Sequence, residues 1–348
     1  MHRNNFPSDG HFFLSSTLKR WFSVHKRSLP WRNRPTPYMV WISEVMLQQT
    51  RANVVIPYFE RWMQEFPTIL SVAQASLEKV MKAWEGLGYY SRVRNLHEAA
   101  KRIVQMHEGE VPAARDSLQK IKGLGRYTIG ALLSFAFHQK AAAVDANALR
   151  VLVRYFAITG DVSKSSVQKE IWALAEAMLP DDEPWIVVEA LIELGATLCM
   201  QEPKCYRCPL HSHCRAFHQG NAATLPLKKR KNSIQMLRRH VIVIQSQDSF
   251  LLKQGEKGKV MADLYEFLYC EESMTIEKFL QGLPFPCTLE RFLEEQKHSF
   301  TRFRVTLLPS LWKTEQPMPV EGCRWVSKRE IHALPFSSGH KKVVQSLL

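Results

Sequence analysis

Two carboxylates lie in contrasting surroundings in the sequence. Glu44 lies inside the apolar run Val40-Trp-Ile-Ser-Glu-Val-Met-Leu47, where burial on a helix would raise its pKa and keep it protonated for general-acid work. Asp145 follows three alanines and a valine and opens a helix, whose N-terminus favours a charged carboxylate. One acid and one anion suit cleavage of a glycosidic bond. The plainer alternatives are an exposed or ion-paired helical glutamate and a simple helix N-cap.

Four of the seven cysteines form the pattern Cys199-x5-Cys205-x2-Cys208-x5-Cys214. Four thiolates in one short loop suit a [4Fe–4S] cluster or a zinc ion. Zinc sites with four cysteines usually contain two Cys-x2-Cys pairs, and this loop contains one. We therefore rank the iron–sulfur cluster first, zinc second, and chance clustering of structural cysteines third.

A glycine-containing turn joins two predicted helices in the range 116–137. Its sequence is Lys122-Gly123-Leu124-Gly125-Arg126, and the second helix begins at Tyr127. The glycines leave the backbone open to a ligand, and the following helix N-terminus directs N–H groups at an anion. This arrangement resembles the helix–hairpin–helix motif, which contacts the DNA backbone without reading sequence. An ordinary turn between helices is the alternative.

The bulk composition favours a globular protein of two domains that meets polyanions. The chain has 348 residues, a formal net charge of +14, and 45% hydrophobic against 23% charged residues. A basic protein with no nucleic-acid role would have the same charge. The sequence contains no apolar run of membrane-spanning length and no signal-peptide core, so we expect a cytoplasmic protein that does not engage a membrane.

The periodicity of apolar residues changes along the chain, which places the domains. Helical spacing predicts helices near 37–47, 54–66, 76–85, 91–107, 126–138, 145–157, 166–179 and 184–198. Alternation then predicts a hairpin of 240–245 with 250–253, and strands at 299–308 and 323–326, with helical patches near 275–281 and 327–333. We therefore predict a mainly α domain over 1–220, a basic linker over 221–239, and an α+β domain over 240–348. We give equal weight to two interpretations of the linker: that it contacts nucleic acid, and that it is a charge run that is merely solvated.

Several motifs in this order resemble the MutY adenine DNA glycosylases of the endonuclease III superfamily. They are Leu29-Pro-Trp-Arg32, Trp41-Ile-Ser-Glu-Val-Met-Leu-Gln-Gln-Thr50, Gly86-Leu-Gly-Tyr-Tyr90, and Gly195-Ala ahead of the cysteines. The resemblance covers residues 29–218 strongly and implies a helix–hairpin–helix glycosylase domain with an iron–sulfur loop at 199–214. It implies a MutT/Nudix-like domain for the remainder.

The resemblance also implies roles for individual residues. Glu44 would protonate N7 of a flipped adenine, Asp145 would stabilise or trap the sugar cation, and Asn147 would support them. Extrusion of the base is required because the bond is unreachable inside a duplex. The remaining implied residues fall into an adenine pocket (Trp31, Arg32, Glu189), a duplex wedge (Gln48, Tyr89) and a backbone clamp (Lys122, Gly123, Gly125, Arg126).

Tyr127 lies where bifunctional relatives place a nucleophilic lysine. Because a phenol cannot form a Schiff base, the resemblance implies a monofunctional enzyme that leaves an abasic site. Simple packing at a helix start is the alternative for this residue. A catalytic Nudix box is not apparent in the tail, so the tail is expected to bind 8-oxoguanine opposite the adenine.

Three departures from the family pattern are visible. Phe300-Thr301-Arg302 replaces the usual Phe-Ser-His of the tail, and the first cysteine gap has five residues instead of six. At the last position of the tail motif, Arg302 has no hydrogen-bond acceptor, unlike the neutral histidine that it replaces. Ala146 replaces a glycine between Asp145 and Asn147, and would add strain if that position required a positive φ.

The expected partner is double-stranded DNA carrying adenine opposite 8-oxoguanine or guanine. We also expect a monomer that works beside replication or repair proteins. Two other functions compete with adenine excision. A bifunctional pyrimidine-lesion glycosylase is disfavoured by Tyr127, and a lesion-binding protein without catalysis is disfavoured by the presence of both Glu44 and Asp145.

Overall fold

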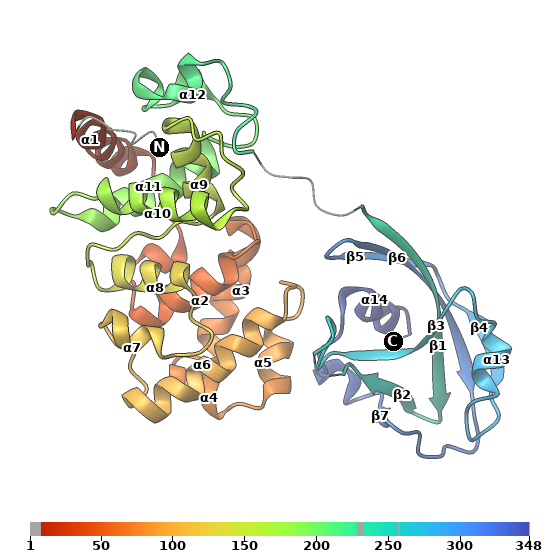
Figure 1. Cartoon of the computed structure of the whole chain (residues 1–348). Helices are drawn as coiled ribbons and strands as arrows, with labels where there is room; N and C mark the ends of the chain where they lie inside the picture. The colour runs from red at the N-terminus through yellow and green to blue at the C-terminus, as the bar shows by residue number, and fades with distance from the viewer. Residues whose placement is uncertain (1–7, 228–232, 257, 348) are drawn as a thin grey trace. The chain divides into compact units, whose positions relative to one another are not determined.

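The computed structural model of the chain describes residues 8–227, 233–256 and 258–347. The chain divides into two compact units (Figure 1). One comprises Met1–Ala73 with Glu98–Arg230, and the other comprises Gln74–His97 with Lys231–Leu348. The helical segment 74–97 therefore groups with the C-terminal sheet, which the predicted boundary at residue 220 did not anticipate. Within this unit the side chain of Glu85 accepts the backbone N–H of Phe336 at 2.9 Å.

The described residues before 228 contain helices and no strand, as the periodicity predicts. Ser76 and Thr36 each accept an N–H from their helix's first turn, as N-caps do. The helices are α1 (Ser8–His25), α2 (Pro37–Leu47), α3 (Ala52–Glu65), α4 (Ile69–Gln74), α5 (Leu77–Ala83), α6 (Ser91–His107), α7 (Arg115–Gln119), α8 (Arg126–Ala131), α9 (Ala146–Tyr155), α10 (Ser165–Ala177), α11 (Pro184–Thr197) and α12 (Arg215–His218).

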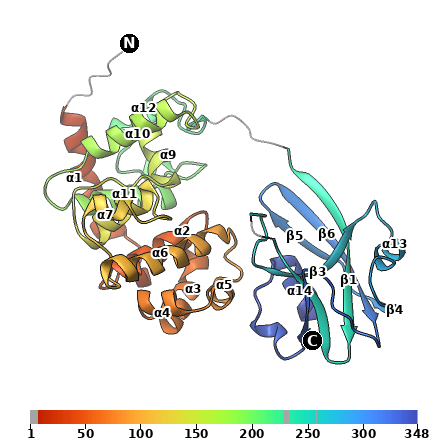
Figure 2. The same ribbon diagram turned by 60° about the horizontal axis from the view of Figure 1, so that its bottom comes forward.

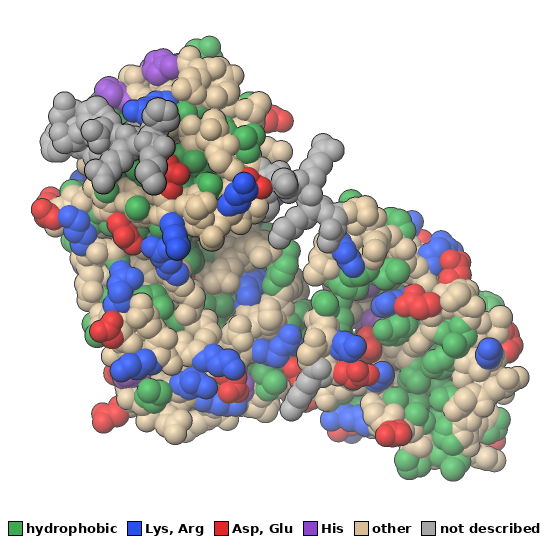
Figure 3. All heavy atoms as spheres, in the orientation of Figure 1, with side chains coloured by type: hydrophobic (Ala, Val, Ile, Leu, Met, Phe, Trp, Pro, Cys, Tyr) green, Lys and Arg blue, Asp and Glu red, His purple; other side chains and the backbone are tan. Residues whose placement is uncertain are grey.

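The core of the helical unit forms where α1, α9 and α11 meet. Leu18, Leu152 and Leu194 are completely buried there, and each such side chain contributes about 2 kcal/mol through removal from water. The helix predicted over 126–138 instead changes at Leu132 into a π-helical turn, Leu132–Ala136. Lys and Arg side chains are spread over the face of this unit shown in Figure 3.

The C-terminal unit is a mixed sheet with a helix against each face (Figure 2). The strand order is β4-β6-β1-β3-β2-β7, with β5 also paired to β6 and β1 parallel to β6. Apolar side chains on one face pack against α14, and those on the other face pack against α13. The elements are β1 (Gln235–Ser246), β2 (Ser249–Gln254), β3 (Tyr265–Glu271), α13 (Ile276–Leu280), β4 (Thr288–Phe292), β5 (Gln296–Phe300), β6 (Phe303–Lys313), β7 (Cys323–Ser327) and α14 (Ser338–Leu347).

Some predictions for this unit were wrong in detail. The single strand predicted over 299–308 is a hairpin, because β5 ends at Phe300 and β6 begins at Phe303. The helix predicted near 327–333 is reduced to one 3₁₀ turn, Ile331–Ala333. The hairpin of β1 and β2 exists, but its registered pairs are confined to two positions beside the turn.

The predicted linker over 221–239 overlaps the first strand. β1 begins at Gln235, where Arg238 pairs with Glu272 at 2.9 Å and Arg239 pairs with Glu271 at 2.8 Å. These two arginines therefore belong to the sheet, since both lie in β1 and pair with acidic residues at the end of β3 and just after it. The other four basic residues of the run fall at 228–231, outside the described residues.

Candidate active site

Glu44 is a buried carboxyl on α2. Thr36 caps this helix by accepting a hydrogen bond from the backbone N–H of Met39 at 3.2 Å. The neighbouring Trp41 and Ile42 are at most 1% exposed, so α2 passes through the interior of the helical unit. Glu44 is itself only 7% exposed, which agrees with the burial predicted from its apolar run.

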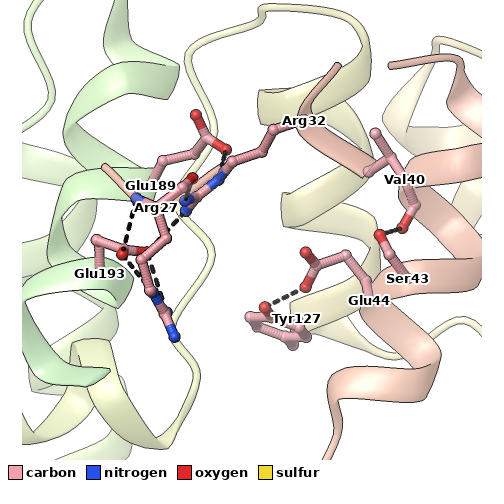
Figure 4. A network of polar contacts seen from close by, with 8 residues as sticks. All are labelled: Arg27, Arg32, Val40, Ser43, Glu44, Tyr127, Glu189 and Glu193. Atoms are coloured by element: carbon pink, nitrogen blue, oxygen red, sulfur yellow. Dashed lines mark hydrogen bonds and ion pairs between the residues drawn. The ribbon is translucent and has the colours of Figure 1, made fainter. Parts of the chain in front are cut away.

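The hydroxyl of Tyr127 donates a hydrogen bond to Oε2 of Glu44 (Figure 4). Burial raises the pKa of Glu44 to about 7; the Tyr127 hydrogen bond opposes the rise, and the charges of Asp145 and Glu189 add to it. Burial also raises the pKa of Tyr127 well above its usual value, so the phenol keeps its proton. A carboxyl that is about half protonated near neutral pH is suited to donate a proton there.

Asp145 is the N-cap of α9 and faces the same cavity as Glu44. Its Oδ1 accepts the backbone N–H groups of Asn147 at 2.9 Å and Ala148 at 2.7 Å, and its Oδ2 accepts the side-chain amide of Asn147 at 2.8 Å. Burial raises the pKa of Asp145, and these hydrogen bonds lower it. The hydrogen bonds at the helix N-terminus therefore favour the charged form of Asp145, as the sequence predicts, while burial acts in the opposite direction with a larger effect.

Ala146 introduces no strain at this turn. It is the first helical residue of α9, so the position does not require the left-handed backbone that would favour glycine.

Asn147 connects Asp145 to a second polar residue, Arg150. The side-chain oxygen of Asn147 accepts a hydrogen bond from Nη2 of Arg150 at 2.9 Å. Arg150 also donates to the backbone carbonyls of Gly195 and Cys199, each at 2.7 Å. A continuous chain of hydrogen bonds therefore runs from the backbone of the first loop cysteine to the carboxylate of Asp145.

Two glycines let neighbouring backbones approach the turn that carries Asp145. A Cβ on Gly195 of α11 would lie 2.6 Å from the backbone oxygen of Asn147 and 2.7 Å from its Cβ. A Cβ on Gly130 of α8 would lie 2.0 Å from the backbone oxygen of Ala142, just ahead of the turn. Both positions exclude a side chain, so helix backbones fix the turn from two sides.

A cavity of about 1530 Å³ contains the two carboxylates. This volume exceeds the roughly 300–1,000 Å³ of a typical small-molecule pocket, so a base with its attached backbone has room. Trp31 lies in its wall and packs edge-on against Phe59, at 5.5 Å between ring centroids. The predicted residues that line it are Trp31, Arg32, Glu44, Gln48, Tyr127, Asp145, Asn147 and Glu189.

Across the cavity from Glu44 lies an ionic network that the sequence did not predict (Figure 4). Glu193 is completely buried and pairs with Arg27 at 2.5 Å and with Arg32 at 3.0 Å. Arg32 also pairs with Glu189 at 3.2 Å. Glu189 and Glu193 are four residues apart in the apolar helix α11, a spacing that places both on one face and could have indicated the pair.

The four loop cysteines carry free thiols at the edge of the helical core. All four are partly buried, and each packs against the cluster that contains α9 and α11. Burial, together with the neighbouring thiols, raises the pKa values of Cys205, Cys208 and Cys214. Arg154, buried beneath the loop, donates to Sγ of Cys199 at 3.4 Å and to the carbonyl of Met200 at 2.5 Å.

This donor set fits a group held by four thiolates, because thiolates are the preferred ligands of iron–sulfur centres. Within the described residues, no group of three or more His, Cys, Asp or Glu side chains forms a ready site for one metal ion.

The predicted DNA-contacting residues lie in different parts of the structure. Gly125 caps α8, and Lys122, Gly123 and Arg126 are exposed beside it, in the predicted turn between α7 and α8. Arg126 stacks on Trp172 at 3.9 Å and pairs with Glu176 at 3.3 Å, so its charge is already engaged.

The two predicted wedge residues belong to different units of the chain. Gln48 ends α2 and donates to the hydroxyl of Thr128 at 3.5 Å. Tyr89 belongs to the other unit, is half-exposed and has a φ of 48°. A left-handed backbone is uncommon for an aromatic residue and accompanies functional loops.

Comparisons with known proteins assign the family. The HhH-GPD superfamily of base excision DNA repair proteins matches residues 42–177, and a NUDIX domain matches residues 239–346. Human adenine DNA glycosylase is 33% identical over 395 residues, which covers 94% of this chain and 72% of the human protein. The adenine DNA glycosylase of Buchnera aphidicola subsp. Schizaphis graminum is 30% identical and covers 97% of this chain and 98% of its own. The chain belongs to the adenine DNA glycosylase family.

Solved structures agree with this family for the helical part. A thermostable thymine-DNA glycosylase superposes with a TM-score of 0.56 at 27% identity, covering 61% of this chain and 98% of that one. A trapped endonuclease III–DNA covalent intermediate superposes at 0.54 and 24% identity, over 62% of this chain and 99% of that one, which shows the shared fold. The chain is thus a base-excision DNA glycosylase with a C-terminal Nudix domain.

In this member of the adenine DNA glycosylase family, the tail residues Phe300, Thr301 and Arg302 lie at a hairpin tip. Phe300 pairs with Phe303 across the turn, and Thr301 has a φ of 47°. Thr301 and Arg302 are exposed, and the guanidinium of Arg302 lies 5.3 Å from the ring of Phe303.

In the described residues, no helix has both the length and the apolar character needed to cross a bilayer.

Proposed function

We propose that the protein excises adenine opposite 8-oxoguanine or guanine in duplex DNA and leaves an abasic site. The observation that carries this proposal is the pair of carboxyls in one cavity. Glu44 has a pKa near neutrality and a hydrogen bond from Tyr127, and Asp145 caps a helix beside it. The family membership adds the substrate class.

The two carboxyls divide the chemistry between them. Protonated Glu44 donates to N7 of the flipped adenine, which withdraws electrons from the glycosidic bond as C1′–N9 breaks. The carboxylate of Asp145 stabilises the positive charge that develops on the sugar, and water completes the hydrolysis. Asn147 keeps that carboxylate oriented through two hydrogen bonds, one from its backbone and one from its side chain.

Tyr127 supports hydrolysis without strand cleavage. A lyase step needs an amine that forms a Schiff base with C1′ of the sugar, and the side chain beside Glu44 is a phenol that keeps its proton. We therefore infer that the enzyme is monofunctional.

Cys199, Cys205, Cys208 and Cys214 would hold a [4Fe–4S] cluster. The cluster would staple the loop to the helical core and supply redox-capable iron at its edge. Arg154 would assist by donating to the sulfur of Cys199, and Arg150 would connect the loop backbone to Asn147.

DNA binding would use two sets of residues. The turn with Lys122, Gly123 and Gly125 offers exposed backbone N–H groups to a phosphate, and Arg126 reinforces the adjoining helix through Trp172. Gln48 and Tyr89 would fill the duplex where the base leaves. Residues 1–220 would form the catalytic domain, apart from the segment that groups with the Nudix domain.

The tail hairpin would read the base opposite adenine. Thr301 offers a hydroxyl that accepts the N7–H of 8-oxoguanine, whereas Arg302 only donates. Guanine has an acceptor at N7, which suits Arg302, so we infer a smaller preference for 8-oxoguanine than a histidine would give.

The test is single-turnover excision on duplexes with adenine opposite 8-oxoguanine, guanine or thymine, with and without alkali. We expect breaks only after alkali, fastest opposite 8-oxoguanine and slowest opposite thymine. Breaks before alkali, or trapping by borohydride, would contradict the monofunctional assignment. Loss of adenine from none of the duplexes would remove the proposed function itself.

A further inference from the structure

Arg32 divides its guanidinium between two carboxylates of α11. Its Nε donates to Oε1 of Glu189 at 3.2 Å, and its Nη2 donates to Oε2 of Glu193 at 3.0 Å. Its Nη1 donates to the backbone oxygen of Arg27 at 3.1 Å. A guanidinium placed in this way contacts each carboxylate through one nitrogen, and it is not free to form a two-pronged pair with either.

Glu189 lines the cavity, and its second oxygen is consequently left without a hydrogen bond from Arg32. Oε2 of Glu189 accepts no hydrogen bond from the described residues, and the side chain is 23% exposed. A carboxylate oxygen in such a place is an acceptor for an N–H donor on a ligand. Adenine presents such a donor, its exocyclic amine, beside the N7 atom that Glu44 addresses.

Glu193 is what keeps Arg32 from closing onto that oxygen. The side chain of Glu193 is 0% exposed and is held from the other side by Arg27, whose Nε and Nη2 approach it at 2.5 Å and 3.1 Å. A fully buried carboxylate is costly unless it is paired, and here two guanidiniums pair with it. Its charge draws one arm of Arg32 away from Glu189.

We propose that Glu193 is a positioning residue for base selection: by engaging Arg32, it leaves Oε2 of Glu189 free to accept the exocyclic amine of adenine. This inference rests on the proposed function and assigns a role to a residue whose side chain is completely buried. If Glu193 loses its charge, Arg32 closes onto Glu189 in a two-pronged pair and occupies the acceptor.

Comparison of two substrates separates this role from a structural one. Unsubstituted purine keeps N7 for Glu44 but lacks the exocyclic amine. Single-turnover excision is measured on one duplex carrying either adenine or purine, for the wild-type protein and Glu193→Gln. We expect adenine excision to fall by about 10- to 100-fold, the effect of one hydrogen bond to a charged group, and purine excision to change by less than about threefold.

Arg27→Gln is the matched variant, because it disturbs the same buried network from the other side. Glu193 then holds Arg32 alone, Oε2 of Glu189 stays open, and the adenine-to-purine ratio is expected to stay within about threefold of wild type. Asp181→Asn, which breaks the exposed ion pair with Lys140, controls for loss of a surface charge and should change neither rate.

The outcomes separate the inference from the proposed function. Equal losses for adenine and purine in Glu193→Gln, or no loss for either, would overturn the positioning role. Excision of neither base by the wild-type protein would instead defeat the proposed function. If Glu193→Gln does not fold, Glu193→Asp draws the carboxylate back from Arg32 and should lower the adenine-to-purine ratio severalfold; an unchanged ratio would refute the inference.

Discussion

Replacement of Glu44 by glutamine should stabilise the helical unit while it abolishes excision. The pKa of Glu44 rises from 4.5 to about 7 on folding, because burial disfavours its charged form. Between these values the folded state binds more protons than the unfolded state, so stability falls as pH rises. The resulting penalty is about 1 kcal/mol at pH 5 and about 3 kcal/mol at pH 8. Neutral glutamine does not incur this penalty.

Denaturant unfolding of the wild-type protein and Glu44→Gln, at pH 5 and pH 8, tests this magnitude. We expect the variant to be more stable by about 2–3 kcal/mol at pH 8 and by about 1 kcal/mol or less at pH 5. Glu60→Gln, on the exposed face of α3, is the control and should show no such difference. A variant less stable than wild type at pH 8, or a gain independent of pH, would refute the reasoning.

Three further outcomes are expected at the site. The apparent second-order rate constant for excision should fall about tenfold per pH unit well above 7, because Glu44 must carry a proton, and should also fall in acid, because Asp145 must be charged; a rate that rises with pH above 7 would contradict this. Gly195→Ala should slow excision by at least about 100-fold, since the new Cβ would displace Asn147, while DNA-binding affinity stays within about threefold. Arg154→Met should lower the iron content per chain, because the sulfur of Cys199 and the backbone carbonyls of Met200, Gln201 and Leu225 lose their buried donor. Full iron content in the variant would contradict this expectation.

The features that sequence alone predicts are the local ones. Thr36 and Pro37 are a capping pair, so the start of α2 is predictable, and the apolar residues around Glu44 imply its burial. The range of α6 is predicted without error because its apolar residues recur at helical spacing. The role of Asp145 as an N-cap is also evident from local sequence.

The features that sequence does not predict depend on contacts between distant segments. Glu193 meets Arg27 from a segment 166 residues away, and no local pattern contains that distance. Arg150 needs the carbonyls of Gly195 and Cys199, which the fold brings to it. The hairpin at Thr301 is predicted as one strand, because Thr-Arg lacks the Asn or Gly that usually marks a two-residue turn.

In the proposed mechanism, the contact between Tyr127 and Glu44 also bears on the state of Glu44 after proton transfer. Once Glu44 has given up its proton, its carboxylate keeps the phenol O–H as a donor, and a hydrogen bond to an anion is stronger than one to a neutral acid. The tyrosine therefore favours the charged form of Glu44, against the larger effect of burial. In the proposed mechanism, this one hydroxyl group would make the proton of Glu44 easier to transfer to the base.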